Sequence, residues 1–378
     1  DWFTGEIIGA VTLPASVEFV GYRAFPDECD VTALNPQVHF ETAAEYAERI
    51  PEYDWYGDEA ADALYSDGLF DYELSSRGAV LLDCSRFLNQ PEVPDVLEIP
   101  ATLGGYPVTA IGGWVFSSLD GCPLDAPFEV VLPEGLRALD ADTFADCFYA
   151  ANVTLPASLE IIPEGCFGRI PAEIDFPNGN PRYSCENGFL IDRDTQTLLY
   201  AAPSSQGQPI PAVRRLGDSA LDNWKPAGNE IRLPDTLESI GPYALDGQYT
   251  GDFSPLAALI LPDGVRELSD CSIYGCWEIQ LLRFPATLTE IPAYCVANCG
   301  LGAVEIPEGV TRIGEFAFYY YDWEQTELSA VTLPASVEFV GFRAFPDECE
   351  ITALNPDTHF ETEEEINQRN PDWAYRIP

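Results

Sequence analysis

The sequence predicts a solenoid built of short strands and turns, with a parallel sheet along one side. Three observations lead to this fold class. Apolar residues directly before proline recur along the 378 residues, most often at intervals of 22, 23, 27 or 28. Further apolar positions keep fixed distances from these residues, and the stretch 8–42 returns almost unchanged as 328–362. Such a period indicates one supersecondary unit per repeat, which buries its apolar face only by stacking on its neighbours.

Each repeat begins with a strand that ends at an apolar residue before proline, here called the anchor. Nine of the ten anchors have an apolar residue two positions earlier. Because residues two apart on a strand share a face, both side chains are expected in the core. Proline then ends the strand, since it offers no N–H to the ladder. The anchors are Leu13, Ile99, Leu132, Leu155, Ile210, Leu233, Leu261, Phe284, Ile306 and Leu333.

The second half of each repeat turns the chain and sends two more side chains inward. Eight anchors are followed by apolar residues after 7 and after 12 positions. Four repeats carry a glycine eight positions after the anchor, where we expect it to permit a tight turn. These glycines are Gly21, Gly241, Gly314 and Gly341. Gly104 and Gly105 lengthen the repeat of Ile99, and the repeat of Ile210 is one residue short.

The combined pattern LxxVxLPxSVxxVGxxAFxxC resembles the BspA-like leucine-rich repeats of bacterial cell-surface proteins. Leu97–Phe116 is similar to an entry segment of that family, and the segments near 70–84 and 183–203 are similar to its β-hairpins. The resemblance covers most of the chain, although several repeats lack the terminal cysteine. It implies a β-rich leucine-rich-repeat solenoid of about ten repeats of ~23 residues, interrupted by two β-hairpin insertions.

The matching ends suggest how the chain is organised. Residues 8–42 and 328–362 are identical at 28 of 35 positions. We expect residues 1–51 to be the terminal repeat and cap of a preceding module, and 52–66 to be an acidic aromatic linker. Residues 67–378 would then form a second module with its end cap at 350–378. The alternative is one continuous solenoid with a cap at each end. Because the chain starts within the pattern and contains no methionine, we expect a piece of a longer protein.

Composition excludes several classes of partner. The net charge is −45, from 63 acidic and 18 basic residues, and Lys225 is the only lysine. Such a chain repels nucleic-acid backbones and anionic lipids, so we expect neither as a partner. No apolar run approaches the ~20 residues that span a bilayer, so we expect no membrane insertion in this segment.

The cysteines, histidines and carboxylates do not predict a catalytic or metal site. The eleven cysteines follow the repeat, so Cys271–Cys295 or Cys276–Cys299 disulfides are conceivable, but a ladder of buried thiols is favoured. There is no CxxC, and His39 and His359 are copies of one another. Asp140–Asp146 and Asp192–Thr197 loosely resemble calcium loops but lack the glycine and glutamate of that motif, which favours turns. We therefore expect no enzyme, no metal and no cofactor.

Outward positions on the strands give the candidate binding site. These positions lie one and three residues before each anchor, and in successive repeats they carry aliphatic residues between arginines. Such a patch in an acidic chain is typical of protein-binding surfaces. Another segment covering these residues is the alternative, and the aromatic run Phe316–Trp323 is a second candidate. The candidate residues are Arg232, Ile260, Leu281, Arg283 and Glu305.

The resemblance implies the function. We expect a non-enzymatic binding or adhesion module of a bacterial protein, extracellular or at the cell surface. It would bind a protein or glycan on host or microbial surfaces through the exposed sheet face. The alternative is a structural spacer in which tandem modules project another domain.

Overall fold

The computed structural model divides the chain into two compact units, which are considered separately. One unit comprises Asp1–Asp62 with Ser75–Arg77, and the other comprises Ala63–Leu74 with Gly78–Pro378. The residues described are 10–13, 19–20, 30–33, 39–40, 65–88, 95–116, 128–144, 147–168, 170–222, 224–228, 230–246, 257–275, 278–320 and 328–370.

The first unit contains four described strands in two parallel pairs. Strand β1 (Ala10–Leu13) pairs with β3 (Asp30–Ala33), and β2 (Phe19–Val20) pairs with β4 (His39–Phe40). Parallel strands of one chain require a crossover connection. The chain that links the strand of one repeat to the strand of the next would provide it.

The second unit begins with a sheet of mixed direction. Its order is β12-β10-β7-β6-β5, with β9 also paired to β10. Strands β5 and β6 are antiparallel, whereas β7, β10 and β12 are parallel neighbours. The elements are β5 (Tyr65–Ser66), β6 (Asp71–Ser75), β7 (Gly78–Asp83), α2 (Ser85–Leu88), β9 (Thr102–Leu103), β10 (Tyr106–Ile111) and β12 (Ala138–Leu139).

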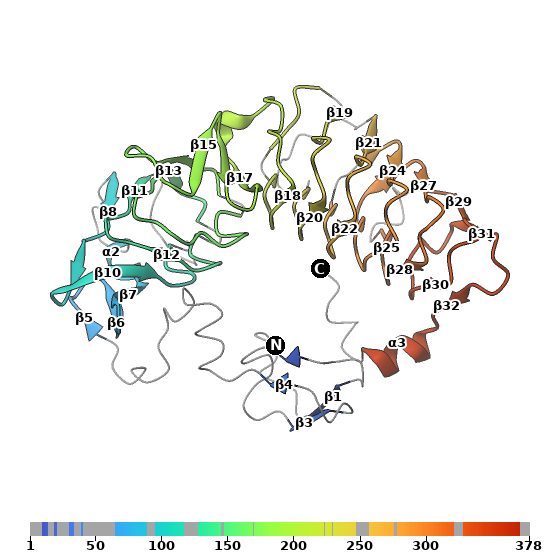
Figure 1. Ribbon diagram of the computed structural model, residues 1–378, viewed down its shortest axis with the longest axis horizontal. Coiled ribbons are helices and arrows are strands. Elements are labelled where there is room, and N and C mark those ends of the chain that lie inside the picture. The colour runs from blue at the N-terminus through green and yellow to red at the C-terminus, as the bar shows by residue number, and fades with distance from the viewer. Residues whose placement is uncertain are drawn as a thin grey trace. The chain divides into compact units, whose positions relative to one another are not determined.

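Most of the described strands that precede anchors lie in two four-stranded parallel sheets, here called the first and second anchor sheets, whereas the strand before Leu333 pairs separately. The first has the order β14-β13-β11-β8 and the second β19-β21-β24-β27. The first consists of β8 (Val96–Glu98), β11 (Phe128–Val131), β13 (Ala150–Thr154) and β14 (Glu173–Asp175). The second consists of β19 (Glu230–Ile231), β21 (Ala258–Ile260), β24 (Leu282–Arg283) and β27 (Val304–Glu305). Figure 1 shows these strands following one another in chain order.

The later strands of each repeat form further parallel pairs. Parallel strands β18, β20 and β22 form one such series, which begins beside an antiparallel β15-β16-β17 segment. Strands β25, β28, β30 and β32 form another, here called the return sheet. The bounds are β15 (Tyr183–Glu186), β16 (Phe189–Asp192), β17 (Thr197–Ala201), the 3₁₀ helix η1 (Pro203–Ser205), β18 (Arg215–Leu216), β20 (Ser239–Ile240), β22 (Glu267–Leu268), β25 (Glu290–Ile291), β28 (Arg312–Ile313), β30 (Phe339–Val340) and β32 (His359–Phe360).

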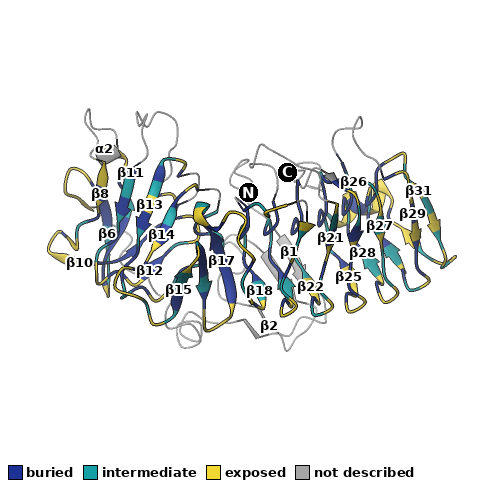
Figure 2. Cartoon of the chain, turned by 90° about the horizontal axis from the view of Figure 1, so that it is seen from above, coloured by how far each residue is buried: buried dark blue, intermediate teal, exposed yellow. Residues whose placement is uncertain are grey.

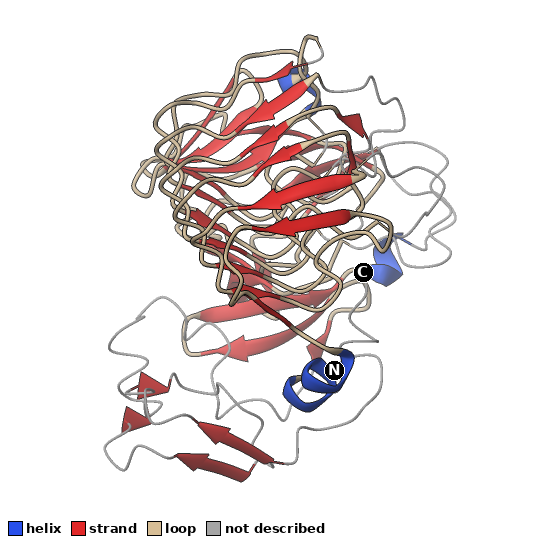
Figure 3. Cartoon of the chain, turned by 90° about the vertical axis from the view of Figure 1, so that its right-hand side faces the viewer, coloured by secondary structure: helices blue, strands red, loops and turns tan. Residues whose placement is uncertain are grey.

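Two short parallel pairs and a helix complete the second unit. They are β23 (Glu278–Ile279) with β26 (Gly300–Leu301), β29 (Ala330–Leu333) with β31 (Glu350–Ala353), and α3 (Glu363–Arg369). Strands and loops dominate this unit in Figure 3, as the sequence predicts. The predicted solenoid with parallel sheets is confirmed. The anchor strands, however, form separate sheets rather than one continuous sheet.

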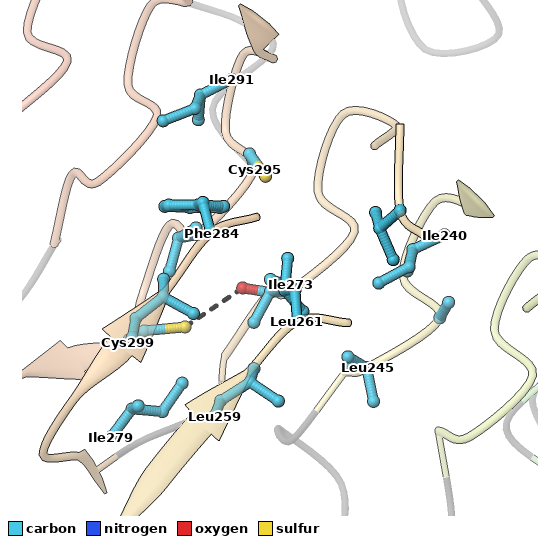
Figure 4. Packing of buried hydrophobic residues seen from close by; sticks show 14 of the residues in the cluster. Ile240, Leu245, Leu259, Leu261, Ile273, Ile279, Phe284, Ile291, Cys295 and Cys299 are labelled. Carbon is cyan, nitrogen blue, oxygen red and sulfur yellow. Dashed lines mark hydrogen bonds between the residues drawn. The ribbon is translucent and has the colours of Figure 1, made fainter. Parts of the chain in front are cut away.

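The core contains the residues that the repeat pattern predicts. Leu259, Leu282 and Leu333 have 0 % of their surface exposed, as do Ile291 and Val296 from the later offsets. Alternation between buried and exposed residues can be followed along β29 in Figure 2. Figure 4 shows side chains from consecutive repeats packing together in this core. Burial of these side chains, repeated at each step, is the main source of the solenoid's stability.

Aromatic side chains stack where the twelfth position after the anchor is phenylalanine. The rings of Phe116 and Phe144 have centroids 4.6 Å apart, and those of Phe144 and Phe167 are 5.1 Å apart. All three side chains are almost fully buried. Phe116 belongs to the lengthened repeat of Ile99, so the insertion at Gly104–Gly105 leaves the core position intact.

A tight turn begins at the glycine eight positions after the anchor, where Ala244 and Ala344 donate to the carbonyls of Gly241 and Gly341, but the predicted reason for glycine, its φ angle, was wrong. Neither Gly314 nor Gly341 has a positive φ angle. A side chain on Gly314 would instead overlap the backbone of Ala293 in the preceding repeat. The left-handed residues lie two positions later, at Phe316 and Arg343, with φ angles of 54° and 49°. Glycine is needed here because backbones of neighbouring repeats approach closely. Gly21 lies outside the described residues.

Hydroxyl groups connect the repeats at a position that the sequence pattern also marks. Three residues after their anchors, Ser158 donates to the carbonyl of Leu136 at 2.8 Å and Thr236 donates to that of Val213 at 2.7 Å. Both carbonyls belong to the preceding repeat. A serine or threonine at this place satisfies a backbone acceptor that the turn leaves without a strand partner.

Helix α3 covers an aromatic cluster beside the last repeats. Its N-cap, Thr362, and Glu365 form a reciprocal capping box. Ile366 is fully buried in the cluster that contains Tyr294 and Phe316. Arg369 forms an ion pair with Glu361 at 2.9 Å, and a second carboxylate lies near the same guanidinium. Within the described residues, no helix is long and apolar enough to cross a membrane.

Candidate protein-binding face

The second anchor sheet brings the predicted site residues together. Ile260 lies opposite Arg283 in the register of β21 and β24, and Arg283 lies opposite Glu305 in β27. Arg232 follows β19, whose Ile231 pairs with Leu259, so the register extended by one residue sets Arg232 beside Ile260. The carbonyl of Leu281 accepts the N–H of Leu259 at 2.9 Å. Four of the five residues therefore form one row across the strands, and Leu281 belongs to the neighbouring row.

The charges in this row are balanced. Arg283 and Glu305 form an ion pair of 2.7 Å, and Arg232 lies 3.3 Å from Glu230. The hydrogen bond that Arg283 donates to the Glu305 carboxylate raises the pKa of the Arg283 guanidinium. All of these side chains are exposed, so the pairs orient the charged groups more than they stabilise the fold.

The middle of the face is apolar. Ile260 has 52 % of its surface exposed, and Leu281 is half-buried. The neighbouring row also carries Ala258 and Ala303, which leave the aliphatic side chains accessible from the side. A cluster of exposed aliphatic residues with a polar rim is the usual composition of a protein-binding surface.

The first anchor sheet offers a contrast within the same chain. Its outward positions carry Glu98, Glu129, Glu173 and Asp175, and its described strands carry no arginine. The net formal charge of these positions is therefore negative, whereas the outward positions of the second anchor sheet, taken over both rows, carry two arginines and two glutamates. Both sheets expose an aliphatic side chain, Val96 on the first and Ile260 on the second, but the charges at the described outward positions are balanced only on the second.

A pocket of ≈ 340 Å³ lies beside β19, and sequence reasoning did not find it. Glu230 and Arg232 stand at its rim, so the pocket continues the binding face. Its floor includes Trp224, which is 8 % exposed and whose Nε1 donates to the carbonyl of Ser205 at 3.1 Å. The full lining is Gly207, Gln208, Pro209, Ile210, Trp224, Pro226, Ala227, Gly228, Glu230 and Arg232.

A second pocket, of ≈ 420 Å³, is lined by ion pairs. Arg182 contacts Asp192 at 2.9 Å, and Arg215 contacts Glu164 at 2.8 Å. Both guanidinium groups also donate to neighbouring backbone or hydroxyl oxygens, Arg182 to the Glu160 carbonyl. These contacts join the antiparallel β15–β17 segment to the adjacent repeats. We interpret this network as structural, because its guanidinium groups are already bound to carboxylates.

Comparison with known proteins identifies the family. The model of the BspA type leucine-rich repeat region matches six copies, over residues 106–184 and 246–366. The chain belongs to the BspA-type leucine-rich-repeat family. No curated protein sequence matches this chain.

Solved structures similar to this BspA-type protein include a leucine-rich cell surface protein from Faecalibacterium prausnitzii. The identity is 16 %, the match covers 81 % of this chain and 97 % of that protein, and the TM-score is 0.39. A leucine-rich repeat protein from Eubacterium ventriosum is 15 % identical, with 80 % and 98 % covered and a TM-score of 0.43. The pneumococcal vaccine antigen PcpA is 14 % identical, with 91 % and 79 % covered and a TM-score of 0.44.

Six of the eight described cysteines of this BspA-type solenoid are buried. Cys271 and Cys295 are free and buried, so the conceivable bond between them is not formed. Burial raises the pKa of Cys271 to about 11 and that of Cys295 to about 12. The Cys299 thiol donates to the carbonyl of Ile273 at 3.1 Å (Figure 4). Cys276 lies outside the described residues. The buried thiols are therefore poor nucleophiles.

The other sequence candidates have structural roles where they are described. Asp192 starts the turn between β16 and β17, and Asp140 starts another turn, as predicted. The Nε2 atom of His359 lies 3.2 Å from Glu365 at the start of α3. In the aromatic run, Phe316 and Phe318 are buried, and residues 321–323 lie outside the described part. No cluster of potential metal ligands occurs among the described residues.

Proposed function

We propose that this protein is a non-enzymatic binding module that recognises a partner through the outward face of the second anchor sheet. One observation carries the proposal. In a chain of net charge −45, Ile260 and Leu281 are accessible on a surface where arginines balance glutamates. An evenly solvated scaffold would instead repeat the acidic surface of the first anchor sheet, so the difference favours recognition.

The partner we propose is a protein or glycan on host or microbial surfaces, and the location is the bacterial cell surface or the medium outside it. Membership of the BspA-type family supports the location. Adhesion is the role in which a stack of short repeats offers a broad surface to a large partner. Acidic repulsion disfavours nucleic acids and anionic membranes as partners.

The test is capture of partners from mixed host-matrix and bacterial-surface proteins. The intact chain is compared with a Leu281→Ala/Arg283→Ala variant and with a control, Glu129→Ala/Asn152→Ala on the first anchor sheet. We expect one partner to be retained by the intact chain and the control and lost by the first variant. Equal retention by all three would exclude the second anchor sheet as the binding face.

A structural spacer is the second candidate, and the duplicated ends favour it. The strand pairs β1–β3 and β29–β31 have the same register. Ala10 lies opposite Asp30 in the first pair, and Ala330, at the corresponding position, lies opposite Glu350 in the second. The pairs β2–β4 and β30–β32 match in the same way. Tandem modules with closely matching ends would serve as rigid segments of repeated length. Absence of any captured partner for all three proteins would favour this function.

A further inference from the structure

Strand β19 is an edge strand because the repeat before it forms no anchor strand. In the described part of the chain, β19 pairs only with β21. The preceding repeat has its anchor at Ile210, and 207–210 would supply the missing strand. The anchor sheet therefore stops at β19, and its other edge faces the pocket lined by Gly207, Pro209 and Trp224.

Two residues explain why the preceding repeat offers no strand. The N–H of Gln208, at the inward position two residues before the anchor, donates to the carbonyl of Ser205 at 2.9 Å. Pro209, at the outward position, has no N–H to offer to the repeat on its other side. In a regular repeat the N–H groups of inward positions donate forward, as when Leu261 donates to the carbonyl of Arg283 at 3.1 Å. No hydrogen bond from Ile210 to the carbonyl of Arg232 is found among the described residues.

The backbone groups on the open edge can be assigned from the regular repeats. N–H groups at inward positions donate to the following repeat, as Leu259 donates to Leu281. Since successive N–H groups of a strand point to opposite sides, the N–H of Arg232 points to the open edge. Glu129, an outward residue of the first sheet, donates backward to Asp95 at 2.9 Å in the same way.

We propose that the open edge of β19 and the adjacent pocket bind an extended polypeptide segment of the partner. The segment adds a strand beside β19, and one apolar side chain enters the pocket above Trp224. This proposal deepens the proposed function by naming the chemistry of the partner and rests on it. A strand edge presents alternating donors and acceptors at the spacing of a polypeptide backbone, which selects a peptide over a sugar or a lipid.

Charge narrows the segment further. The rim carries Glu230 and Arg232 only 3.3 Å apart, and both side chains are exposed. Because the rim carries one negative and one positive side chain, any single charge on the segment would be repelled by one of them. The rim therefore favours a segment that is uncharged near the inserted side chain. A strongly acidic segment is also disfavoured by the net charge of −45. We therefore assign the site to a neutral segment with a large apolar residue at its centre.

The probe is a phage-displayed library of linear dodecapeptides, selected on the intact chain. One enriched peptide is then synthesised, and its affinity is measured by calorimetry for the intact chain and three variants. Arg232→Pro removes the edge N–H, and Arg232→Ala removes only the side chain. Ala227→Trp fills the pocket from its wall. Melting temperatures establish that each variant is folded.

We expect Arg232→Pro and Ala227→Trp each to weaken binding about tenfold or more, and Arg232→Ala to weaken it clearly less than Arg232→Pro. In the intact chain, bound peptide should slow hydrogen exchange at the Arg232 amide, which is a readout that holds even if the proline variant fails to fold. Equal affinity for Arg232→Pro and Arg232→Ala, or unchanged exchange, overturns strand addition.

The outcomes separate this proposal from the proposed function. If the selection enriches no peptide, the peptide-binding site is overturned. The protein capture with Leu281→Ala/Arg283→Ala still tests separately whether the sheet face binds a partner. A glycan array that binds the intact chain and Arg232→Pro but not Ala227→Trp also overturns it, because the pocket would then take a sugar without strand addition.

Discussion

The guanidinium carbon of Arg312 lies 4.0 Å from the centroid of the Phe339 ring. The two residues are direct partners in β28 and β30 of the return sheet. Glu290 forms an ion pair of 3.2 Å with Arg312, and the ring of His359 lies 5.6 Å from that of Phe339. An outward row therefore crosses the return sheet from one repeat to the next, as another does on the second anchor sheet.

The contact between Arg312 and Phe339 should be measurable as a coupling energy. A double-mutant cycle of Arg312→Ala and Phe339→Leu in chemical denaturation should give about 0.5–1 kcal/mol, because leucine keeps apolar area but removes the aromatic ring. A cycle that combines Arg266→Ala with Phe339→Leu is the control. Arg266 is three repeats earlier, so its coupling should be near zero.

Replacing Leu282 by aspartate should unfold the repeats around β24. Leu282 is fully buried at an inward strand position, and an unpaired carboxylate there costs several kcal/mol. The measurement is the melting curve followed by circular dichroism. Thr332→Asp, at an exposed position of β29, should leave the melting temperature nearly unchanged. An unaltered curve for Leu282→Asp would contradict the assigned register.

Gly314→Ala should destabilise the protein although glycine does not have a special φ angle there. The added methyl group would overlap the backbone of Ala293, and relieving such an overlap typically costs about 1–3 kcal/mol. Gly228→Ala is the matched control, since nothing lies within 4 Å of its added Cβ. The measurement is the denaturant midpoint of each variant, which should be lower for Gly314→Ala than for Gly228→Ala. Equal midpoints would mean that neighbouring repeats can separate without cost.

Asp192 should make stability depend on pH at the acidic end. Burial raises the pKa of this carboxyl, but the hydrogen bond and charge of Arg182 outweigh it and the net pKa is lowered. A carboxylate with a lowered pKa stabilises the fold above its ordinary pKa of about 3.9, and this contribution is lost as pH falls through the lower folded value.

The comparison with Asp192→Asn isolates that contribution. The difference in unfolding free energy between the intact chain and this variant should be constant from pH 7 to about pH 5 and should shrink below about pH 4. Arg182→Met should remove the decline in that difference, because the carboxyl then loses the partner that lowers its pKa. A difference that grows as pH falls would have the wrong sign for a lowered pKa.

Much of the core follows from the sequence because each repeat solves the same packing problem. Val296 and Phe318 were predicted inside from their distance to an anchor, and both are buried. The predicted role of Gly314 failed because the pattern shows only that glycine recurs. It does not show whether φ or a neighbouring backbone requires the glycine. The hydroxyl of Thr236 was equally visible in the pattern, but its acceptor belongs to another repeat.

The candidate site was only partly readable. The row through Ile260 and Arg283 follows from strand alternation, which is a local property. The pocket beside β19 exists because Pro209 and Gln208 keep one repeat from forming its anchor strand. It also depends on Trp224, whose hydrogen-bond acceptor, Ser205, lies 19 residues earlier in the chain. Such a departure from periodicity is marked in the sequence by a proline directly before an anchor, but its geometry depends on the chain that follows.

Arg283 and Glu305 meet across the sheet although they are 22 residues apart in the chain. Each repeat thus contributes one or two outward residues to a surface whose rows run across the strands, perpendicular to the direction of the chain. Gain or loss of a complete repeat would preserve the packing of the core and would add or remove the outward residues of one strand in a single genetic event. A solenoid of this kind can therefore change what it recognises by recombination between its own repeats, without passing through unfolded intermediates in evolution.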